Sequence, residues 1–268
     1  MNGRRPFFLF TMLAFGYAFL YAPIVLLIVY SFNESRLVTV WSGFSVKWYG
    51  ELLHNRQLLE AAWLSLRIAV VNATLAMILG TMAGVVLARY RRFRGRGLFA
   101  TMIAAPLVMP EVILGLSLLL LFVAMETWVG WPAGRGATTI VIAHVTFTMA
   151  YVAVIVQAKL VAFDESLEEA AMDLGARPLT VFFSITLPLI APAVVAGWLL
   201  AFTLSFDDLV ITSFVSGPGA STLPMVVYSS VRLGVSPQIN ALATIIVVAV
   251  GVIITTAGWL LYRRDRTA

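Results

Sequence analysis

Long apolar runs alternate with short polar or mixed segments along the whole of this chain. Six runs are long enough, at about 1.5 Å per residue, to cross the roughly 30 Å apolar core of a bilayer as helices. These runs are residues 7–32, 64–88, 99–123, 139–158, 189–215 and 238–262. The pattern predicts an all-α integral membrane protein with six transmembrane helices in one domain over residues 1–268.

The composition supports a membrane protein and narrows the chemistry. Hydrophobic residues make up 61% of the chain and charged residues 12%, with a mean hydropathy of +0.96. Such a small charged fraction would not cover the surface of a soluble protein of this size. The chain has no cysteine and two histidines, which excludes disulfides and thiol catalysis and argues against a metal site.

Basic residues predict the orientation of the chain in the membrane. Twelve lysines and arginines lie on one side of the expected spans, five on the other, and Arg67 is unassigned. The richer side holds Arg4, Arg5, Arg89, Arg91, Arg92, Arg94, Arg96, Lys159, Arg177, Arg263, Arg264 and Arg266. The positive-inside rule therefore places both termini in the cytoplasm. The net charge of +5 could also indicate nucleic-acid binding, but these short loops explain it as an orientation signal.

The first apolar run has an alternative explanation. Arg4 and Arg5 precede it, as basic residues precede the apolar part of a cleaved signal peptide. The run is longer than that part and is not followed by a small-x-small cleavage site. A transmembrane span is the better prediction.

Residues 159–188 form an acidic interval between two apolar runs and are expected to lie in water as a cytoplasmic loop. A helix starting at Asp164 would place its apolar residues on one face, with Gly175 ending it and Pro178 opening a second short helix. The apolar face consists of Phe163, Leu167, Ala170, Ala171 and Leu174. By itself this pattern is also that of an ordinary surface helix.

Three acidic residues lie within apolar runs, where a charge is costly. Glu111 follows Pro106 and Pro110, about 18 Å along a helix that starts near residue 99. Asp207 and Asp208 lie about 27 Å along the fifth run, toward the outer face. Adjacent residues diverge around a helix, so only one aspartate can face a central path. The alternatives are a glutamate held at a helix interface and two acids that reach the outer interface.

Two other features predict helix packing. Gly80 and Gly84 form a small-xxx-small pair where a neighbouring helix can approach closely. His144 lies alone in the fourth run, and such a histidine is more often hydrogen-bonded to a neighbouring helix than catalytic. We assign it no chemistry.

The interval 159–188 also carries a motif. Glu169, Ala170 and Ala171, then Gly175, then Ile185, Leu187 and Pro188 resemble the "EAA" loop of permease subunits in bacterial ABC importers. The resemblance implies the type I ABC importer permease fold. It also implies that Glu169, Ala170, Ala171 and Gly175 belong to a coupling helix that sits in a cleft of an ATPase subunit.

Further segments resemble the spermidine/putrescine permeases, the putrescine type most closely. They are residues 22–33, 105–113 and 205–211. The resemblance implies the smaller, second permease subunit of an ATP-driven importer of putrescine, with spermidine as a further substrate, in a bacterial inner membrane. Asp207, Asp208 and Glu111 are then candidates for the substrate path, because carboxylates can replace part of the hydration of a diamine dication.

The partners and cofactors follow from the same resemblance. The chain has no glycine-lysine loop of the kind that binds nucleotide phosphates, so its energy source must be another protein. The family implies a second permease subunit, two ATPase subunits that use ATP and magnesium, and a periplasmic or lipid-anchored polyamine-binding protein. We expect no cofactor on this chain, no enzymatic activity and no nucleic-acid partner.

Three other functions remain open. An importer of another cation or of iron is separated from a polyamine importer only by the aspartate pair. An ion-coupled secondary carrier is disfavoured by the motif and by the lack of visible inverted repeats. A membrane-embedded enzyme is disfavoured because no nucleophile, base and orienting group can be identified.

Overall fold

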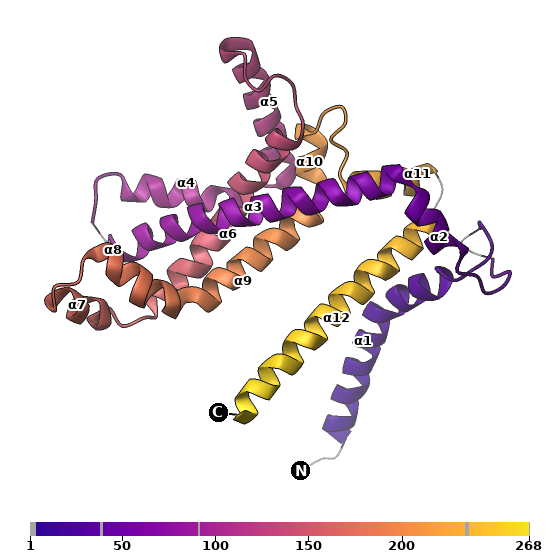
Figure 1. Cartoon of the computed structure of the whole chain (residues 1–268), viewed down its shortest axis with the longest axis horizontal. Helices are drawn as coiled ribbons and strands as arrows, with labels where there is room; N and C mark the ends of the chain where they lie inside the picture. Colours follow the sequence, from indigo (N-terminus) through magenta and orange to yellow (C-terminus); the bar gives the residue numbers. More distant parts are fainter. Residues whose placement is uncertain (1–3, 38–39, 91, 234–235, 268) are drawn as a thin grey trace. The chain divides into compact units, whose positions relative to one another are not determined.

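The computed structural model describes residues 4–37, 40–90, 92–233 and 236–267, and nearly all of them are helical (Figure 1). Over these residues the only β-type pairing is one isolated bridge between Asn33 and Phe44. The chain divides into two compact units, residues 1–59 with 227–268, and residues 60–226. Their boundaries fall within α3 (Arg56–Arg89) and α11 (Leu223–Leu233).

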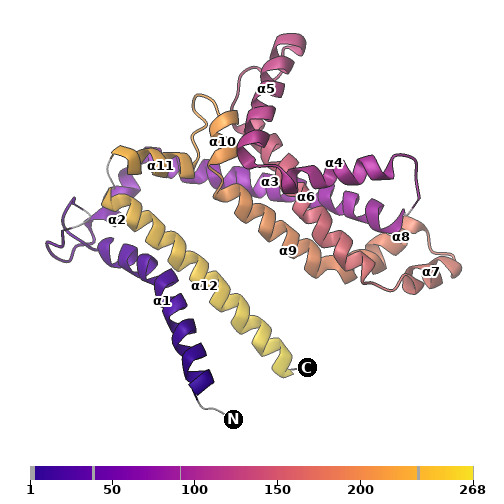
Figure 2. The same cartoon turned by 180° about the vertical axis from the view of Figure 1, so that it is seen from behind.

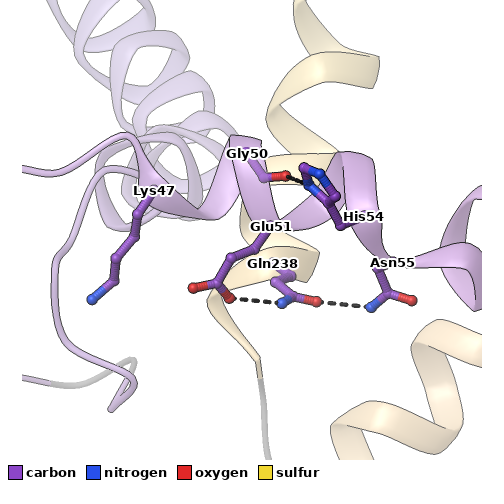
Figure 3. A pocket seen from close by; sticks show the side chains of 6 residues that line it. All are labelled: Lys47, Gly50, Glu51, His54, Asn55 and Gln238. Carbon is purple, nitrogen blue, oxygen red and sulfur yellow. Dashed lines mark hydrogen bonds between the residues drawn. The ribbon is translucent and has the colours of Figure 1, made fainter.

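The first unit holds α1 (Arg4–Tyr30), α2 (Lys47–His54) and α12 (Pro237–Thr267), with α12 packed against both others. Gln238, in the first turn of α12, ties that helix to α2 (Figure 3). Its side-chain amide donates to Glu51 Oε2 over 3.0 Å, and its carbonyl oxygen accepts from the Asn55 amide over 2.8 Å. The loop before α2 is held by Trp48, whose indole N–H donates to the carbonyl of Asn33 over 2.6 Å.

The second unit contains most of the remaining helices, and α6 passes through its core. In chain order they are α4 (Arg96–Val108), α5 (Glu111–Val129), α6 (Ala137–Val161), α7 (Ser166–Asp173), α8 (Pro178–Val181), the π-helical turn η1 (Phe182–Thr186), α9 (Leu187–Phe206) and α10 (Val210–Val215). In Figures 1 and 2, α7 and α8 lie at one end of this unit and α10 lies at the other.

Close packing between α3 and α6 confirms the role predicted for the two glycines. A Cβ atom on Gly80 would lie 2.6 Å from Val152 Cβ and 2.7 Å from the Met149 carbonyl oxygen. On Gly84 it would lie 2.9 Å from the Ala153 carbonyl oxygen. Atoms cannot approach so closely, so this part of α3 requires glycine.

The third apolar run is two helices, so the expectation of one continuous helix is wrong. The chain leaves the helix at Met109, which is extended (φ −80°, ψ 135°), and resumes after Pro110. A proline disfavours the helical conformation of the residue before it and supplies no N–H of its own. Glu111 is therefore the first residue of α5.

The fifth run is also interrupted, and its helix starts earlier than expected. The helical stretch is continuous from Pro178 to Phe206, through η1, so the segment after Gly175 is not a separate short helix. Helix α9 ends at Phe206, and α10 begins after a break at residues 207–209.

Several helices are suited to a bilayer. Of the residues described, five helices are long and apolar enough to cross a membrane, and 96–108 and 237–252 are shorter apolar helices. The five are Phe8–Tyr30, Arg56–Arg89, Glu111–Val129, Ala137–Val161 and Pro178–Phe206. The fold is that of an all-helical, multi-pass membrane protein.

Candidate functional site

The acidic interval forms the predicted helix and turn. The side chain of Asp164 accepts the backbone N–H of Ser166 over 3.0 Å at the start of α7, and this hydrogen bond lowers the pKa of Asp164. Gly175 has φ +88°, and its N–H donates to the Met172 carbonyl over 2.9 Å. Pro178 then occupies the first turn of α8. The glycine stop and the proline start are as predicted.

Helix α7 presents an uncovered surface, because none of its residues is buried. Glu169 and Ala170 are exposed, as is Gly175 beyond the helix, while Ala171 is partly covered. Leu167 is half exposed, and Leu174 is 90% exposed just after the helix. The four residues predicted to couple with an ATPase therefore lie beside exposed apolar side chains.

The opposite side of α7 is bound to the rest of the unit by charges. Arg89, the last residue of α3, lies with Nε 2.9 Å from Glu168 Oε2 and donates from Nη2 to Glu168 Oε1 over 3.0 Å. Its Nη1 lies 3.3 Å from Glu165 Oε1. Consecutive residues point about 100° apart around a helix, so Glu168 can face Arg89 while Glu169 faces outward.

The acids in the fifth run have different surroundings. Asp208 is fixed: its Oδ2 accepts the backbone N–H and the hydroxyl of Thr212, each over 2.7 Å, and lies 3.1 Å from His144 Nε2. Asp207 directly follows the last residue of α9 and is exposed. The prediction that only one of the two faces a path assumed a helix through both residues, whereas the structure places them in the break between α9 and α10. That either aspartate faces a path stays a prediction.

Glu111 is exposed in the first turn of α5. Helix α5 packs against α10, where Leu114 and Leu118 share a core with Ile211 and Val215. Glu111 and the aspartates thus lie on neighbouring parts of the unit. Over the described ranges, no hydrogen bond or ion pair joins Glu111 to either aspartate.

His144 is hydrogen-bonded to neighbouring helices, as predicted. Its Nδ1 lies 2.7 Å from Ser205 Oγ on α9, and its Nε2 lies 3.0 Å from Thr212 Oγ1 on α10. The network continues through Thr148, whose hydroxyl donates to the His144 carbonyl over 2.8 Å and lies 3.1 Å from Asn72 Oδ1 on α3. Each buried polar group here has a partner, as a low-dielectric interior requires.

Sequence reasoning missed most of the residues that hold these sites. The partners of Glu168 and Asp208, namely Arg89, Thr186, Thr212 and His144, were not assigned to them. In the sequence, Arg89 was interpreted only as one of the five arginines of a loop whose charge predicts the membrane orientation. Its partners lie more than seventy residues away in the chain. Only the buried histidine gave a sequence signal, as a lone polar residue in an apolar run.

Comparison with known proteins supplies the family. Residues 80–267 match the family described as "Binding-protein-dependent transport system inner membrane component". The chain is 63% identical over 254 residues to the putrescine transport system permease protein PotI of Escherichia coli K12, covering 95% of this chain and 90% of PotI. It is 44% identical to the spermidine/putrescine permease PotC of the same strain, covering 94% and 92%.

Solved structures share the fold. A chain of a bacterial ABC transporter involved in import of the acidic polysaccharide alginate has a TM-score of 0.72 at 19% identity, with 98% of both chains covered. A chain of the MetNI methionine ABC transporter, in inward-facing conformations, has a TM-score of 0.61 and covers 77% of this chain and 94% of its own. The chain belongs to the family of inner membrane components of binding-protein-dependent transport systems.

Proposed function

We propose that this chain is a permease subunit of an ATP-driven importer that carries putrescine into the cell across the inner membrane. The observation that carries the proposal is the 63% identity to the putrescine permease PotI, which extends over 95% of the chain. The aligned part covers nearly the whole length of both proteins, 95% of this chain and 90% of PotI.

The proposed topology has six spans in one permease domain, with both termini in the cytoplasm. In this scheme α4 and α5 together make the third span and α12 makes the sixth. The distribution of lysine and arginine supports the orientation. It places the loop 159–188 in the cytoplasm, where an ATPase can reach it.

The proposed partners are a second permease subunit, two ATPase subunits and an extracytoplasmic polyamine-binding protein. ATP and magnesium are used by the ATPases, and this chain binds no cofactor. Glu169, Ala170, Ala171 and Gly175 form the docking element for the ATPase. Its exposed leucines supply apolar contact, the small alanines allow close approach, and Glu169 offers a charge to a basic partner.

The proposed path for the dication runs past Asp207 and Glu111, with Asp208 acting at its wall. Exposed carboxylates can exchange hydration water for ammonium groups by charge-assisted hydrogen bonds. The break at residues 207–209 also leaves the carboxyl end of α9 near Asp207, and the negative end of a helix dipole favours a cation. Asp208 already accepts several hydrogen bonds, so its role is to hold this break in place.

Spermidine is the second candidate substrate, favoured by the 44% identity to the spermidine/putrescine permease PotC. A competition experiment separates the two. Cells that lack other polyamine importers and express the complete transporter would be given labelled putrescine with an excess of unlabelled putrescine, spermidine or ferric citrate.

Saturable uptake that excess putrescine abolishes is the expected result. Stronger competition by spermidine would reassign the preferred substrate. No putrescine uptake by an assembled complex, or competition by the ferric salt alone, would contradict a polyamine importer.

A further inference from the structure

The link between α7 and the membrane-spanning helices depends on a small group of polar residues. We call Arg89, Glu168 and Thr186 the latch. The Arg89 side chain is 15% exposed and that of Glu168 13% exposed, although α7 as a whole is uncovered. Arg89 Nη2 donates a hydrogen bond to Glu168 Oε1 over 3.0 Å, and Nε makes an ion-pair contact with Oε2 at 2.9 Å without hydrogen-bond geometry. A hydrogen bond between two charged groups is stronger than one between neutral groups.

Arg89 also contacts the end of α6. Its Nη1 donates to the carbonyl oxygen of Leu160 over 3.2 Å, and its guanidinium carbon lies 5.9 Å from the centre of the Phe163 ring. One side chain at the end of α3 therefore contacts both the last turn of α6 and the helix that follows it. A displacement of α7 cannot leave α3 unaffected while these contacts hold.

Glu168 connects α7 to a third element. The hydroxyl of Thr186 donates to Glu168 Oε1 over 2.6 Å, and Thr186 is buried. Thr186 ends η1, the π-helical turn that leads directly into α9. Single π-helical turns interrupt the regular hydrogen-bond ladder and are frequent at functional sites. Glu168 thus joins the ends of α3 and α9.

The two faces of α7 differ in the contacts that their side chains make. The side chain of Glu169, which is exposed, has no hydrogen bond or ion pair among the residues described. The side chain of Glu168, next to it, makes the contacts to α3 and α9. No buried apolar residue on α7 replaces those contacts. Polar bonds of Glu168 and Glu165 therefore fix the orientation of this helix, with little help from apolar packing.

We propose that the latch transmits movement of α7 to the membrane-spanning helices: Arg89 passes it to α3, and Thr186 passes it to α9. Arg89 and Thr186 are positioning residues, since in this proposal they act through Glu168. This inference rests on the proposed function, in which an ATPase moves α7. When the latch is lost, the ATPase still hydrolyses ATP, but its movement of α7 is passed less effectively to the membrane-spanning helices α3 and α9.

The first test uses distances and needs no substrate. The chain contains no cysteine, so Tyr90→Cys and Asp173→Cys introduce two spin-label sites at the exposed ends of α3 and α7 without removing any native thiol. The complete complex should give one narrow distance distribution, and Arg89→Gln should broaden it, with Arg89→Lys in between. Identical distributions for Arg89→Gln and the parent would contradict the latch.

The second test measures coupling in proteoliposomes that hold the complete complex. Arg89→Gln should lower the putrescine transported per ATP hydrolysed by about tenfold while hydrolysis itself changes less than about twofold. Thr186→Val removes the hydroxyl and should lower the same ratio, and Thr186→Ser should restore it. If Arg89→Gln and Thr186→Val leave the amount of putrescine transported per ATP hydrolysed unchanged, even with both rates lowered, the proposal is contradicted.

Two outcomes separate this inference from the proposed function. If Arg89→Gln loses the ATPase subunits, Arg89 serves assembly, and the inference then stands only if Thr186→Val and Thr186→Ser differ in coupling. If the parent complex transports no putrescine, the substrate assignment fails. The spin-label distances still test the latch in that case.

Discussion

His144 Nε2 lies 3.1 Å from Asp208 Oδ2, and this contact joins α6 to the break between α9 and α10. Both side chains are nearly covered, at 2% and 8% exposure. The aspartate accepts further hydrogen bonds from Thr212, so its carboxylate stabilises the backbone at the start of α10.

His144→Leu should destabilise the protein, because it removes a donor from a buried carboxylate. An unsatisfied buried polar group costs about 1–3 kcal/mol. The free energy of unfolding in mixed micelles with increasing dodecyl sulfate would measure this loss. His54→Leu is the matched control, since His54 is exposed on α2, and it should leave the unfolding free energy unchanged. Equal stability of the two variants would contradict the role given to the His144 contact.

The two aspartates should differ in their effects. Asp207→Asn should lower the rate of putrescine uptake by about tenfold, because a charge-assisted hydrogen bond to the passing ammonium group is lost, and should leave complex yield unchanged. Asp208→Asn should mainly lower stability and yield. Uptake would be normalised to the amount of assembled complex. Normal uptake by Asp207→Asn would remove Asp207 from the path.

Glu169→Lys should weaken association with the ATPase by at least about tenfold, because it places a like charge against a basic partner. Pull-down of the ATPase through a tag on this chain would measure the association. Glu60→Lys makes the same charge change at an exposed position of α3 and should have no effect. A normal pull-down for Glu169→Lys would show that α7 docks without this carboxylate.

Gly80→Ala should destabilise the fold by about 1–3 kcal/mol, because the added methyl group overlaps Val152 and the Met149 carbonyl. Gly97→Ala is the matched control: nothing lies within 4 Å of a Cβ atom there. In a helix this control should be neutral or stabilising by up to about 1 kcal/mol. The unfolding assay used for His144 applies here, and similar values for both glycines would contradict close packing at Gly80.

The sequence predicted those features that depend on local chemistry. Gly175 adopts a positive φ just after α7, and Pro178 lies in the first turn of α8, as their backbone preferences predict. Glycines four residues apart indicated the close approach of α3 to another helix. Such signals need only a few neighbouring residues, so a single sequence contains them.

Features that depend on distant residues could not be predicted. The contact between Arg89 and Glu168 joins residues in different segments, and nothing near either residue signals the other. The continuous helix from Pro178 to Phe206 was also not predicted, although Pro188 lies within it. The carbonyl that a proline ring at 188 would meet belongs to Ser184, four residues earlier, and Ser184 lies in the wider η1 turn.

The central claim is that this chain is a permease subunit whose transport is driven by a separate ATPase. It is tested most directly by putrescine uptake into proteoliposomes that hold either the complete complex or the permease subunits without the ATPases. The account predicts uptake only by the complete complex with binding protein, and only while ATP is hydrolysed. Uptake by the permease subunits alone, driven by an ion gradient, would contradict it.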